Sequence, residues 1–298
     1  MKNKILITGS TGLIGKELIS HYLKNGKNNI YQVIRKDSLS KDNFLLKDTE
    51  ILELDLTSNS FIDKLPKDIN TIIHLAQSEN YKNFPVSSND IFNVNVKSTF
   101  ELVEFARLND CRNFFYASSG SVYDNSLKSS LPLDENSSVK SNPDDFYTSS
   151  KIASEKLLFP YSKFLNVIIG RIFFPYGINQ KRNMFMPRII DMINDSKEIT
   201  IYGKKGLVFN PSSVHFIADC IFRLLESKRD GIFNIASSRN ISLAEYAKII
   251  ATILEKELYL KYEKEICNQD YTVNLNFLNH NKDDLYIDDL ESFIKEYN

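Results

Sequence analysis

The sequence predicts an α/β fold, with a doubly wound parallel sheet followed by a smaller α/β lobe towards the C-terminus. Short apolar runs alternate with longer helical patterns through the first half of the chain. Uninterrupted apolar runs indicate strands that are buried on both faces, and the helices between them indicate the crossovers that parallel strands need. The alternation becomes irregular after Gly177, so the second lobe is predicted to begin there.

The predicted strands of the first lobe are short runs rich in β-branched and aromatic residues. They cover residues 5–7, 31–34, 51–54, 71–75, 114–117 and 166–169. A helical pattern at 147–161 precedes the last of these strands. Beyond Gly177, helical patterns cover 185–194, 214–226 and 242–256, and strand patterns cover 199–202 and 231–236. A short amphipathic helix is predicted to close the chain.

The composition excludes several classes of function. The chain has 298 residues, of which 37 are basic and 38 acidic, so no excess of charge favours nucleic acid or anionic lipid. The spacing of Cys111, Cys220 and Cys267 fits neither a disulfide framework nor a zinc site and indicates a reducing compartment. No apolar run approaches the roughly 20 residues that a spanning helix needs. We therefore expect a cytoplasmic protein without metal, nucleic acid or membrane partners.

A glycine loop follows the first predicted strand and opens a helix. Its glycines have separate physical uses: a tight turn, a close approach of backbone to a pyrophosphate, and packing of helix on strand. The helix N-terminus adds unpaired N–H groups and a partial positive charge. A glycine turn without a ligand is the alternative, but the strand–turn–helix context favours a dinucleotide site in a Rossmann domain. The predicted contacts are Gly9, Thr11, Gly12, Leu13, Ile14 and Gly15.

The end of the second strand favours NADP(H) over NAD(H). NAD sites place an acidic residue there against the ribose 2′-hydroxyl, whereas this chain has Arg35 and Lys36. Arg35 can make a bidentate contact with a 2′-phosphate and Lys36 can add charge, or both can be a solvated loop pair. Asp55 ends the third strand, where it is placed either to hydrogen-bond an adenine or to cap a helix.

A catalytic pair is predicted on the helix at 147–161. Tyr147 and Lys151 are four residues apart and therefore share one helix face. The lysine charge is expected to lower the phenol pKa from its usual value of about 10, which makes Tyr147 a candidate general acid and base. Ser119 directly follows the fifth strand, at the sheet edge where ligands bind in open α/β folds. Each signal is weak alone, because such pairs and serine turns are common.

Together these residues carry a family resemblance. The matching motifs are the glycine loop, Asp55, Leu75-Ala76, Asn95-Val96, Ser118-Ser119 with Val122-Tyr123, Tyr147 with Lys151, and residues 171–177. They occur in the order found in extended short-chain dehydrogenases. The chain resembles the NAD-dependent epimerase/dehydratase group that acts on nucleotide sugars, over about residues 4–255.

The resemblance implies a role for each matching residue. Tyr147 would be the acid and base on the sugar hydroxyl or carbonyl, Lys151 would bind the nicotinamide ribose, and Ser119 would hold the reacting oxygen. The implied cofactor contacts outside the glycine loop are Arg35, Lys36, Asp55, Leu56, Leu75, Ala76, Tyr147, Lys151 and Pro175. The implied substrate contacts are Ser119, Gly120, Ser121, Phe174, Asn183 and Arg188.

The pattern along the chain predicts a second lobe interleaved with the end of the first, and the resemblance implies a homodimer. The dinucleotide-binding domain would cover residues 1–177 and about 208–238, and the substrate lobe would cover about 178–207 and 239–298. A homodimer would form through helices around 91–107 and 147–161.

Departures from the family pattern narrow the reaction. Related 4,6-dehydratases place Asp-Glu after the active-site Ser or Thr, where this chain has Gly120 and Ser121, so a dehydratase is not expected. UDP-galactose 4-epimerases place an Asn at the position of Phe174 and an Arg-Asp pair at Ser212-Ser213. A standard UDP-hexose pose is therefore not expected either.

The missing phosphate charge has candidate replacements in Lys181, Arg182 and Arg188, which are otherwise an exposed basic surface. Because NADP(H) pools are kept reduced, the sequence predicts a 4-ketoreductase of a nucleotide-linked deoxysugar, with the proton from Tyr147. A 4-epimerase that retains NAD(P) is the alternative. A non-catalytic nucleotide-binding scaffold is a third possibility, which the retention of Ser119, Tyr147 and Lys151 argues against.

Overall fold

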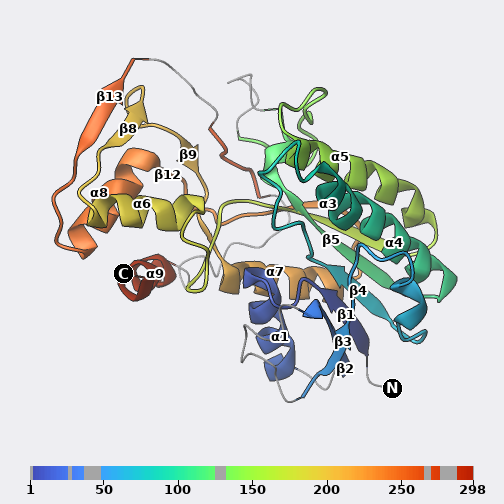
Figure 1. The fold of residues 1–298 in the computed structure, drawn as a ribbon. Helices are drawn as coiled ribbons and strands as arrows, with labels where there is room; N and C mark the ends of the chain where they lie inside the picture. Colours follow the sequence, from blue (N-terminus) through green and yellow to red (C-terminus); the bar gives the residue numbers. More distant parts are fainter. Residues whose placement is uncertain are drawn as a thin grey trace. The chain divides into compact units, whose positions relative to one another are not determined.

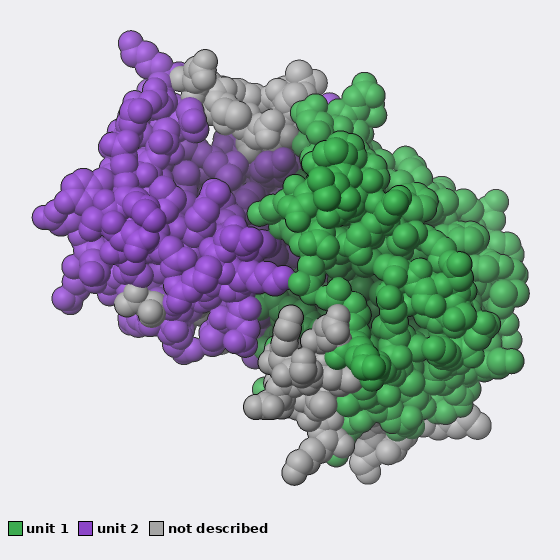
Figure 2. All heavy atoms as spheres, in the orientation of Figure 1, with its two compact units in different colours: residues 1–122, 139–171, 218–233 green, residues 123–138, 172–217, 234–298 purple. Residues whose placement is uncertain are grey.

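The computed structural model describes residues 3–25, 29–36, 48–124, 132–264, 270–275 and 287–297. The chain divides into two compact units of interleaved sequence (Figure 2). Unit 1 consists of residues 1–122, 139–171 and 218–233, and unit 2 of residues 123–138, 172–217 and 234–298. Whether the predicted domain boundaries mark independently folding domains stays a prediction. Cys267 lies outside the described residues, whereas Cys111 and Cys220 are buried thiols.

A seven-stranded sheet forms the centre of unit 1 (Figure 1). Its order is β11-β6-β5-β4-β1-β2-β3. The strands are β1 (Lys4–Thr8), β2 (Asn29–Ile34), β3 (Glu50–Glu53), β4 (Thr71–His74), β5 (Asn113–Ser119), β6 (Asn166–Ile172) and β11 (Gly231–Ile235). β1 pairs in parallel with β2 and β4, and β5 pairs in parallel with β4. The predicted doubly wound sheet is confirmed.

Helices cover both faces of this sheet because the strand order reverses at its centre. From β1 the chain continues to β2 on one side of the sheet, and from β4 it continues to β5 on the other side. Right-handed crossovers then place the helix after β1 and the helix after β4 on opposite faces. α1 (Leu13–Asn25) packs beside α7 (Val214–Glu226), with the rings of Tyr22 and Phe222 5.1 Å apart. α4 (Ser98–Leu108) and α5 (Phe146–Leu158) lie side by side over β4 and β5 (Figure 1). Their apolar faces join the strands in one buried cluster.

Two irregular helical segments accompany α4 and α5. α3 (Ser88–Phe92) continues through a π-helix, η2 (Asn93–Lys97), into α4. The helix predicted over 147–161 ends as an α-helix at Leu158 and continues as the 3-10 helix η5 (Phe159–Lys163). Pro160 explains that change, because its nitrogen cannot donate to the preceding turn.

Unit 2 contains helices with short two-stranded ladders. The helices are α6 (Phe185–Asn194), α8 (Leu243–Ile253) and α9 (Ile287–Tyr297). The strands are β7 (Pro175–Tyr176), β8 (Ile199–Tyr202), β9 (Val208–Phe209), β10 (Ser212–Ser213), β12 (Ile241–Ser242) and β13 (Leu260–Glu263). They pair as β7 with β10, β9 with β12 and β8 with β13. Among the described helices, none is long and apolar enough to span a bilayer.

Candidate active site

The glycine loop between β1 and α1 has no room for a side chain at two positions. Gly9 has a φ of +70°, and a Cβ atom there would lie 2.7 Å from the backbone nitrogen of Ala76. A Cβ atom on Gly15 would lie 2.3 Å from the carbonyl oxygen of Gly9. The loop backbone therefore approaches the start of α1 and the chain after β4. The structure brings together the glycine loop and two other predicted cofactor contacts, Leu75 and Ala76.

The first turn of α1 offers backbone N–H groups that the helix itself cannot pair. Gly12 is exposed there, Leu13 and Ile14 are half-buried, and no acidic side chain lies in the turn. Such a helix end carries partial positive charge and suits a phosphate. Ser10 ties the loop to the end of β2, because its hydroxyl donates to the carbonyl oxygen of Val33 at 3.1 Å.

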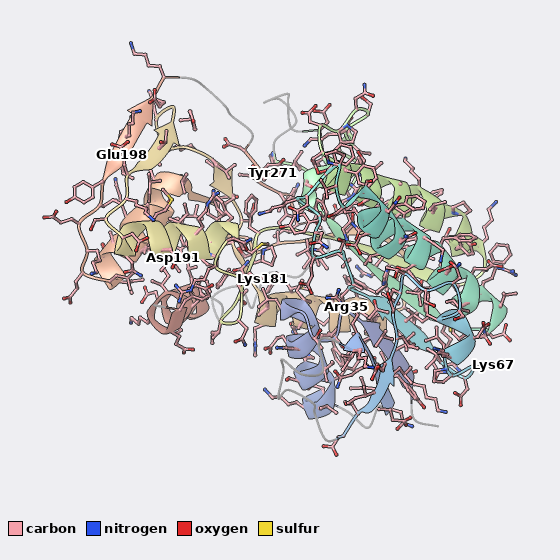
Figure 3. All side chains as sticks on the ribbon, in the orientation of Figure 1. Arg35, Lys67, Lys181, Asp191, Glu198 and Tyr271 are labelled. Carbon is pink, nitrogen blue, oxygen red and sulfur yellow. The ribbon has the colours of Figure 1, made fainter. Side chains whose placement is uncertain are left out.

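Arg35 and Lys36 are exposed after β2. Arg35 (Figure 3) forms an ion pair with Glu79, and each of the two side chains is 56% exposed. Asp55 follows β3, and its Oδ1 accepts hydrogen bonds from Thr57 N at 2.9 Å and Thr57 Oγ1 at 2.8 Å. Asp55 therefore caps a local turn rather than a helix, and its predicted contact with an adenine stays a prediction. Leu56 is buried in the core, so only its backbone can contact a ligand.

The predicted catalytic residues meet in unit 1. Asp145 caps α5 by accepting from Thr148 N at 2.7 Å, which starts the helix directly before Tyr147. The ammonium nitrogen of Lys151 donates to the carbonyl oxygen of Ala117 at 2.8 Å and lies 5.7 Å from the Tyr147 ring centroid. The Ser119 side chain hydrogen-bonds Tyr147. The lysine is fully buried, whereas Tyr147 is half-buried.

Burial controls the protonation of both groups. It raises the pKa of Tyr147 to about 12, although the hydrogen bond from Ser119 lowers it. Burial lowers the pKa of Lys151 to about 7, although the charge of Glu155 raises it. The expectation that Lys151 depresses the pKa of Tyr147 is wrong for the protein alone, because desolvation of the phenol is the larger effect. Tyr147 is consequently a protonated phenol at neutral pH.

Two neighbours of Tyr147 and Lys151 were not predicted as site residues. The ring of Tyr81, from the segment after β4, lies 5.0 Å from that of Tyr147. Asn95, in the π-helix η2, accepts from Ser78 N at 2.9 Å and donates to Ser150 Oγ at 2.9 Å. The amide of Asn95 thus links the segment after β4 to α5. Tyr81 has no recognisable sequence signal, whereas Asn95 belongs to the Asn95-Val96 motif of the family resemblance.

His74, at the end of β4, is a buried core residue. Its Nδ1 lies 2.6 Å from Thr8 Oγ1, and its Nε2 lies 3.0 Å from Thr99 Oγ1. Burial lowers its pKa to about 3, and the charge of Lys151 adds to this effect. The imidazole is therefore neutral at physiological pH and serves to connect β1 with α4.

Gly120 and Ser121 begin the 3-10 turn η3 (Gly120–Val122) directly after β5. Ser121 N donates to Ser119 Oγ at 3.2 Å, and Thr148 Oγ1 donates to Ser121 Oγ at 3.2 Å. These hydrogen bonds orient the serine turn against the start of α5. Neither residue brings an acidic or basic side chain to Tyr147.

The remaining predicted ligand contacts belong to unit 2. Phe174 has a φ of +36°, an uncommon backbone conformation for an aromatic residue, and its ring packs against Phe185, Phe209 and Tyr271. Pro175 begins β7 and is half-buried. Asn183 and Arg188 are exposed.

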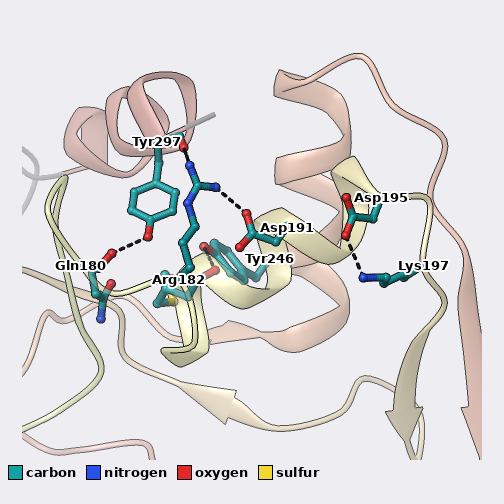
Figure 4. A network of polar contacts seen from close by, with 8 residues as sticks. Gln180, Arg182, Asp191, Asp195, Lys197, Tyr246 and Tyr297 are labelled. Atoms are coloured by element: carbon teal, nitrogen blue, oxygen red, sulfur yellow. Dashed lines mark hydrogen bonds and ion pairs between the residues drawn. The ribbon is translucent and has the colours of Figure 1, made fainter. Parts of the chain in front are cut away.

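The cations beside Asn183 have different environments. Arg182 pairs with Asp191 at 2.5 Å and donates to the carbonyl oxygen of Tyr297 at 3.0 Å (Figure 4). The Tyr297 hydroxyl donates to the carbonyl oxygen of Gln180. Arg182 thus connects the segment before α6 to α9, whereas Lys181 is an exposed residue of the same segment (Figure 3).

Ser212 and Ser213, at the position of the family's Arg-Asp pair, are buried structural residues. They form β10 beside β7. Ser213 Oγ accepts from Phe216 N at 3.2 Å at the start of α7, and Ser212 Oγ accepts from Ser237 N at 3.0 Å. Their hydroxyls therefore support backbone.

Comparison with known proteins identifies the family of the chain. The profile of the NAD dependent epimerase/dehydratase family matches residues 5–236. The dTDP-D-glucose 4,6-dehydratase of Dictyostelium discoideum is 30% identical over 271 residues, which are 84% of this chain and 62% of that protein.

Solved structures give the same fold at lower sequence identity. UDP-N-acetylglucosamine 4-epimerase from Methanobrevibacter ruminantium, in complex with UDP-N-acetylmuramic acid, superposes with a TM-score of 0.84 at 20% identity, covering 100% of this chain and 99% of that one. A variant of UDP-glucuronic acid 4-epimerase from Bacillus cereus, in complex with a fluorinated UDP-sugar and NAD, has a TM-score of 0.81 at 20% identity, covering 99% and 100%.

Proposed function

The chain belongs to the NAD dependent epimerase/dehydratase family, and we propose that it transfers hydride at the sugar of a nucleotide sugar, with Tyr147 as general acid and base. The observation that carries this proposal is the meeting of Ser119, Tyr147 and Lys151 at the end of β5. Relatives whose names describe epimerases and dehydratases of nucleotide sugars support the substrate class.

The residues of unit 1 fit a dinucleotide. The close approach of Gly9 to Ala76 leaves backbone rather than side chains at the glycine loop, and the first turn of α1 offers N–H groups for a pyrophosphate. Lys151 has three ammonium hydrogens and uses one for Ala117, so it retains donors for a ribose. A bound nicotinamide would supply or accept the hydride, and this is the only chemistry assigned to the cofactor.

The chain's own contribution is proton transfer and orientation. With a pKa of about 12, the Tyr147 phenol holds its proton at neutral pH and donates it to the oxygen of a sugar carbonyl. In the oxidative direction, Tyr147 must first release its proton to solvent, and the phenolate oxygen then accepts the proton of the sugar hydroxyl. Ser119 hydrogen-bonds Tyr147, so its hydroxyl is placed to orient the reacting oxygen.

A 4-epimerase is the first candidate because its reaction needs only this set of residues. Epimerisation oxidises the sugar and reduces it again on the other face, with one tyrosine serving both steps. Elimination of water needs an additional acid and base, which Gly120 and Ser121 do not provide. The 4-epimerase structures that share the fold support this candidate, and one of them holds NAD.

A 4-ketoreductase of a nucleotide-linked deoxysugar is the second candidate. Arg35 and Lys36 favour it, because two cations after β2 suit the 2′-phosphate of NADP(H), the cofactor of net reduction. The ion pair of Arg35 with Glu79 would have to open for that contact.

One experiment separates the two candidates. The purified protein would be incubated with UDP-hexoses, UDP-N-acetylhexosamines or UDP-hexuronic acids plus NAD, and inversion at C4 would be followed by NMR. In parallel, NADPH oxidation would be measured with 4-keto-6-deoxy nucleotide sugars made in situ. Inversion without net cofactor turnover establishes the epimerase, and stoichiometric NADPH loss establishes the reductase. If neither occurs under conditions where the cofactor binds, the proposal fails.

A homodimer through α4 and α5 is part of the proposal. Several large apolar side chains on or beside these helices are exposed, and we infer that a second subunit covers them. They are Phe92, Phe100, Leu108, Leu157, Phe159 and Phe164. Light scattering should give twice the mass of the 298-residue chain, and replacement of Phe100 and Phe159 by Glu should give monomers. A monomeric wild-type protein at micromolar concentration would contradict this assembly.

A further inference from the structure

Three successive residues of β5 contact three successive turns of α5. Ala117 accepts a hydrogen bond from Lys151, and Ser119 hydrogen-bonds Tyr147. Between them, Ser118 Oγ donates to Glu155 Oε1. Tyr147, Lys151 and Glu155 follow one another at intervals of four residues and therefore occupy one face of the helix. The end of the strand and this helix face are thus joined residue by residue.

Glu155 is also held from β6. Arg171 Nε donates to Glu155 Oε1 at 3.0 Å, and Arg171 Nη2 donates to Glu155 Oε2 at 2.7 Å. Both side chains are buried, with 3% of Arg171 and 7% of Glu155 exposed. This bidentate geometry, together with Ser118, fixes one carboxylate against β5, α5 and β6 at once.

The charge of Glu155 affects the protonation of Lys151 because the other groups around the ammonium nitrogen do not carry a negative charge in the described part of the structure. On α5 it has Tyr147 on one side and Glu155 on the other. The ring centroid of Tyr116, on β5, lies 5.0 Å from Lys151 Nζ, and His74 on β4 is neutral. Arg171 on β6 is a second buried cation. Glu155 is the carboxylate that opposes the effect of burial on Lys151.

We propose that Glu155 is a positioning residue of the active site, which favours the charged form of Lys151 and holds α5 in register with Ser119. The inference rests on the proposed function for its catalytic consequence, but its electrostatic part concerns Lys151 alone. The competing interpretation is a buried ion pair that only stabilises the fold. The two interpretations differ in whether the charge of Glu155, rather than its shape, determines the protonation of Lys151.

The test compares Glu155→Gln, which keeps shape and loses charge, with Glu155→Asp, which keeps charge and loses one methylene. Titration of the Lys151 side-chain nitrogen is followed by NMR of the ¹⁵N-lysine-labelled full chain, with the resonance assigned by its absence in Lys151→Met. In Glu155→Gln, the midpoint should fall by about one pH unit, and in Glu155→Asp it should stay within about half a unit. If the charged lysine is required, a midpoint that falls from 7 to 6 reduces activity about eightfold at pH 7.5, with recovery as the pH is lowered.

An unchanged midpoint in folded Glu155→Gln would overturn the proposal, whatever happens to its melting temperature. If Glu155→Gln does not fold, Glu155→Asp decides, because a fall of a full unit with the charge retained would equally overturn it. Failure of the proposed function is separate: the lysine midpoint would shift as expected while the wild-type protein converts none of the nucleotide sugars.

Discussion

Arg35, the predicted 2′-phosphate contact, is paired with Glu79, 44 residues further along the chain. The pair joins the end of β2 to the segment after β4. Both side chains are largely exposed, so the ion pair is screened by solvent and can open at little cost. Glu79 therefore competes with the 2′-phosphate of NADP for the guanidinium group of Arg35. Its negative charge would also repel that phosphate.

Replacement of Glu79 by Gln should therefore change the choice of cofactor. Without the carboxylate, Arg35 is available for a 2′-phosphate, and we expect NADP(H) to bind roughly threefold to tenfold more tightly while NAD(H) binding changes little. Arg35→Ala should reverse this preference, and Lys36→Ala should have the weaker effect of a second charge. Titration of each variant with NADH and NADPH by nucleotide fluorescence measures the ratio. Equal changes for both cofactors would mean that Arg35 does not contact the 2′-position.

His74 should make the protein sensitive to acid. Its pKa is about 3 in the folded chain and about 6.5 when the chain unfolds, so between these values the unfolded state binds the extra proton. The free energy of unfolding should fall by about 1.4 kcal/mol per pH unit as the pH decreases through that window, from this residue alone. Urea titrations between pH 7 and pH 4.5 measure the slope.

The variant for that measurement is His74→Gln. His74→Gln should lower the free energy of unfolding at pH 7 by about 1–3 kcal/mol, because the hydrogen bonds of the imidazole are lost. It should also make the free energy of unfolding depend less steeply on pH, because unfolding then takes up one proton fewer. An acid slope in His74→Gln equal to that of the wild type would contradict the buried neutral imidazole.

These residues also mark where sequence reasoning succeeds and fails. The helices predicted at 185–194 and 214–226 agree with α6 and α7 at both ends, because amphipathic periodicity is a local property of the chain. The meeting of Ser119 with Tyr147 follows from topology, since both lie at the carboxyl edge of a parallel sheet. The partner of Arg35 and the burial of Tyr147 depend on tertiary packing, so neither the competing Glu79 nor the raised pKa of the phenol could be predicted.

Gly15 and Gly12 should respond differently to replacement by Ala. A Cβ atom on Gly15 would meet backbone of Gly9 and Ser10 at 2.3 and 2.8 Å, so Gly15→Ala must displace the loop. We expect it to lose about 1–3 kcal/mol of stability and at least about tenfold in dinucleotide affinity.

A Cβ atom on exposed Gly12 would lie 3.1 Å from the Gly9 oxygen, a contact that small shifts relieve. Gly12→Ala should therefore retain stability and lose cofactor affinity, measured by thermal unfolding with and without NADH. Unchanged affinity in both variants would exclude the loop as the phosphate site.

Tyr147→Phe provides the sharpest separation of chemistry from binding. The ring remains in its half-buried place beside Tyr81, so the fold and the cofactor affinity should stay within about threefold of the wild type. Loss of the phenol proton should lower kcat about 10²-fold to 10⁴-fold, because the proposed mechanism draws the proton for the sugar oxygen from this phenol. Tyr81→Phe is the matched control: it removes a neighbouring hydroxyl, and its kcat should stay within about tenfold of the wild type.

Steady-state rates with whichever nucleotide sugar is converted, together with NADH titrations of both variants, give the comparison. If Tyr147→Phe keeps wild-type kcat while Tyr81→Phe loses it, the general acid is Tyr81, and the role of Tyr147 would be reduced to packing.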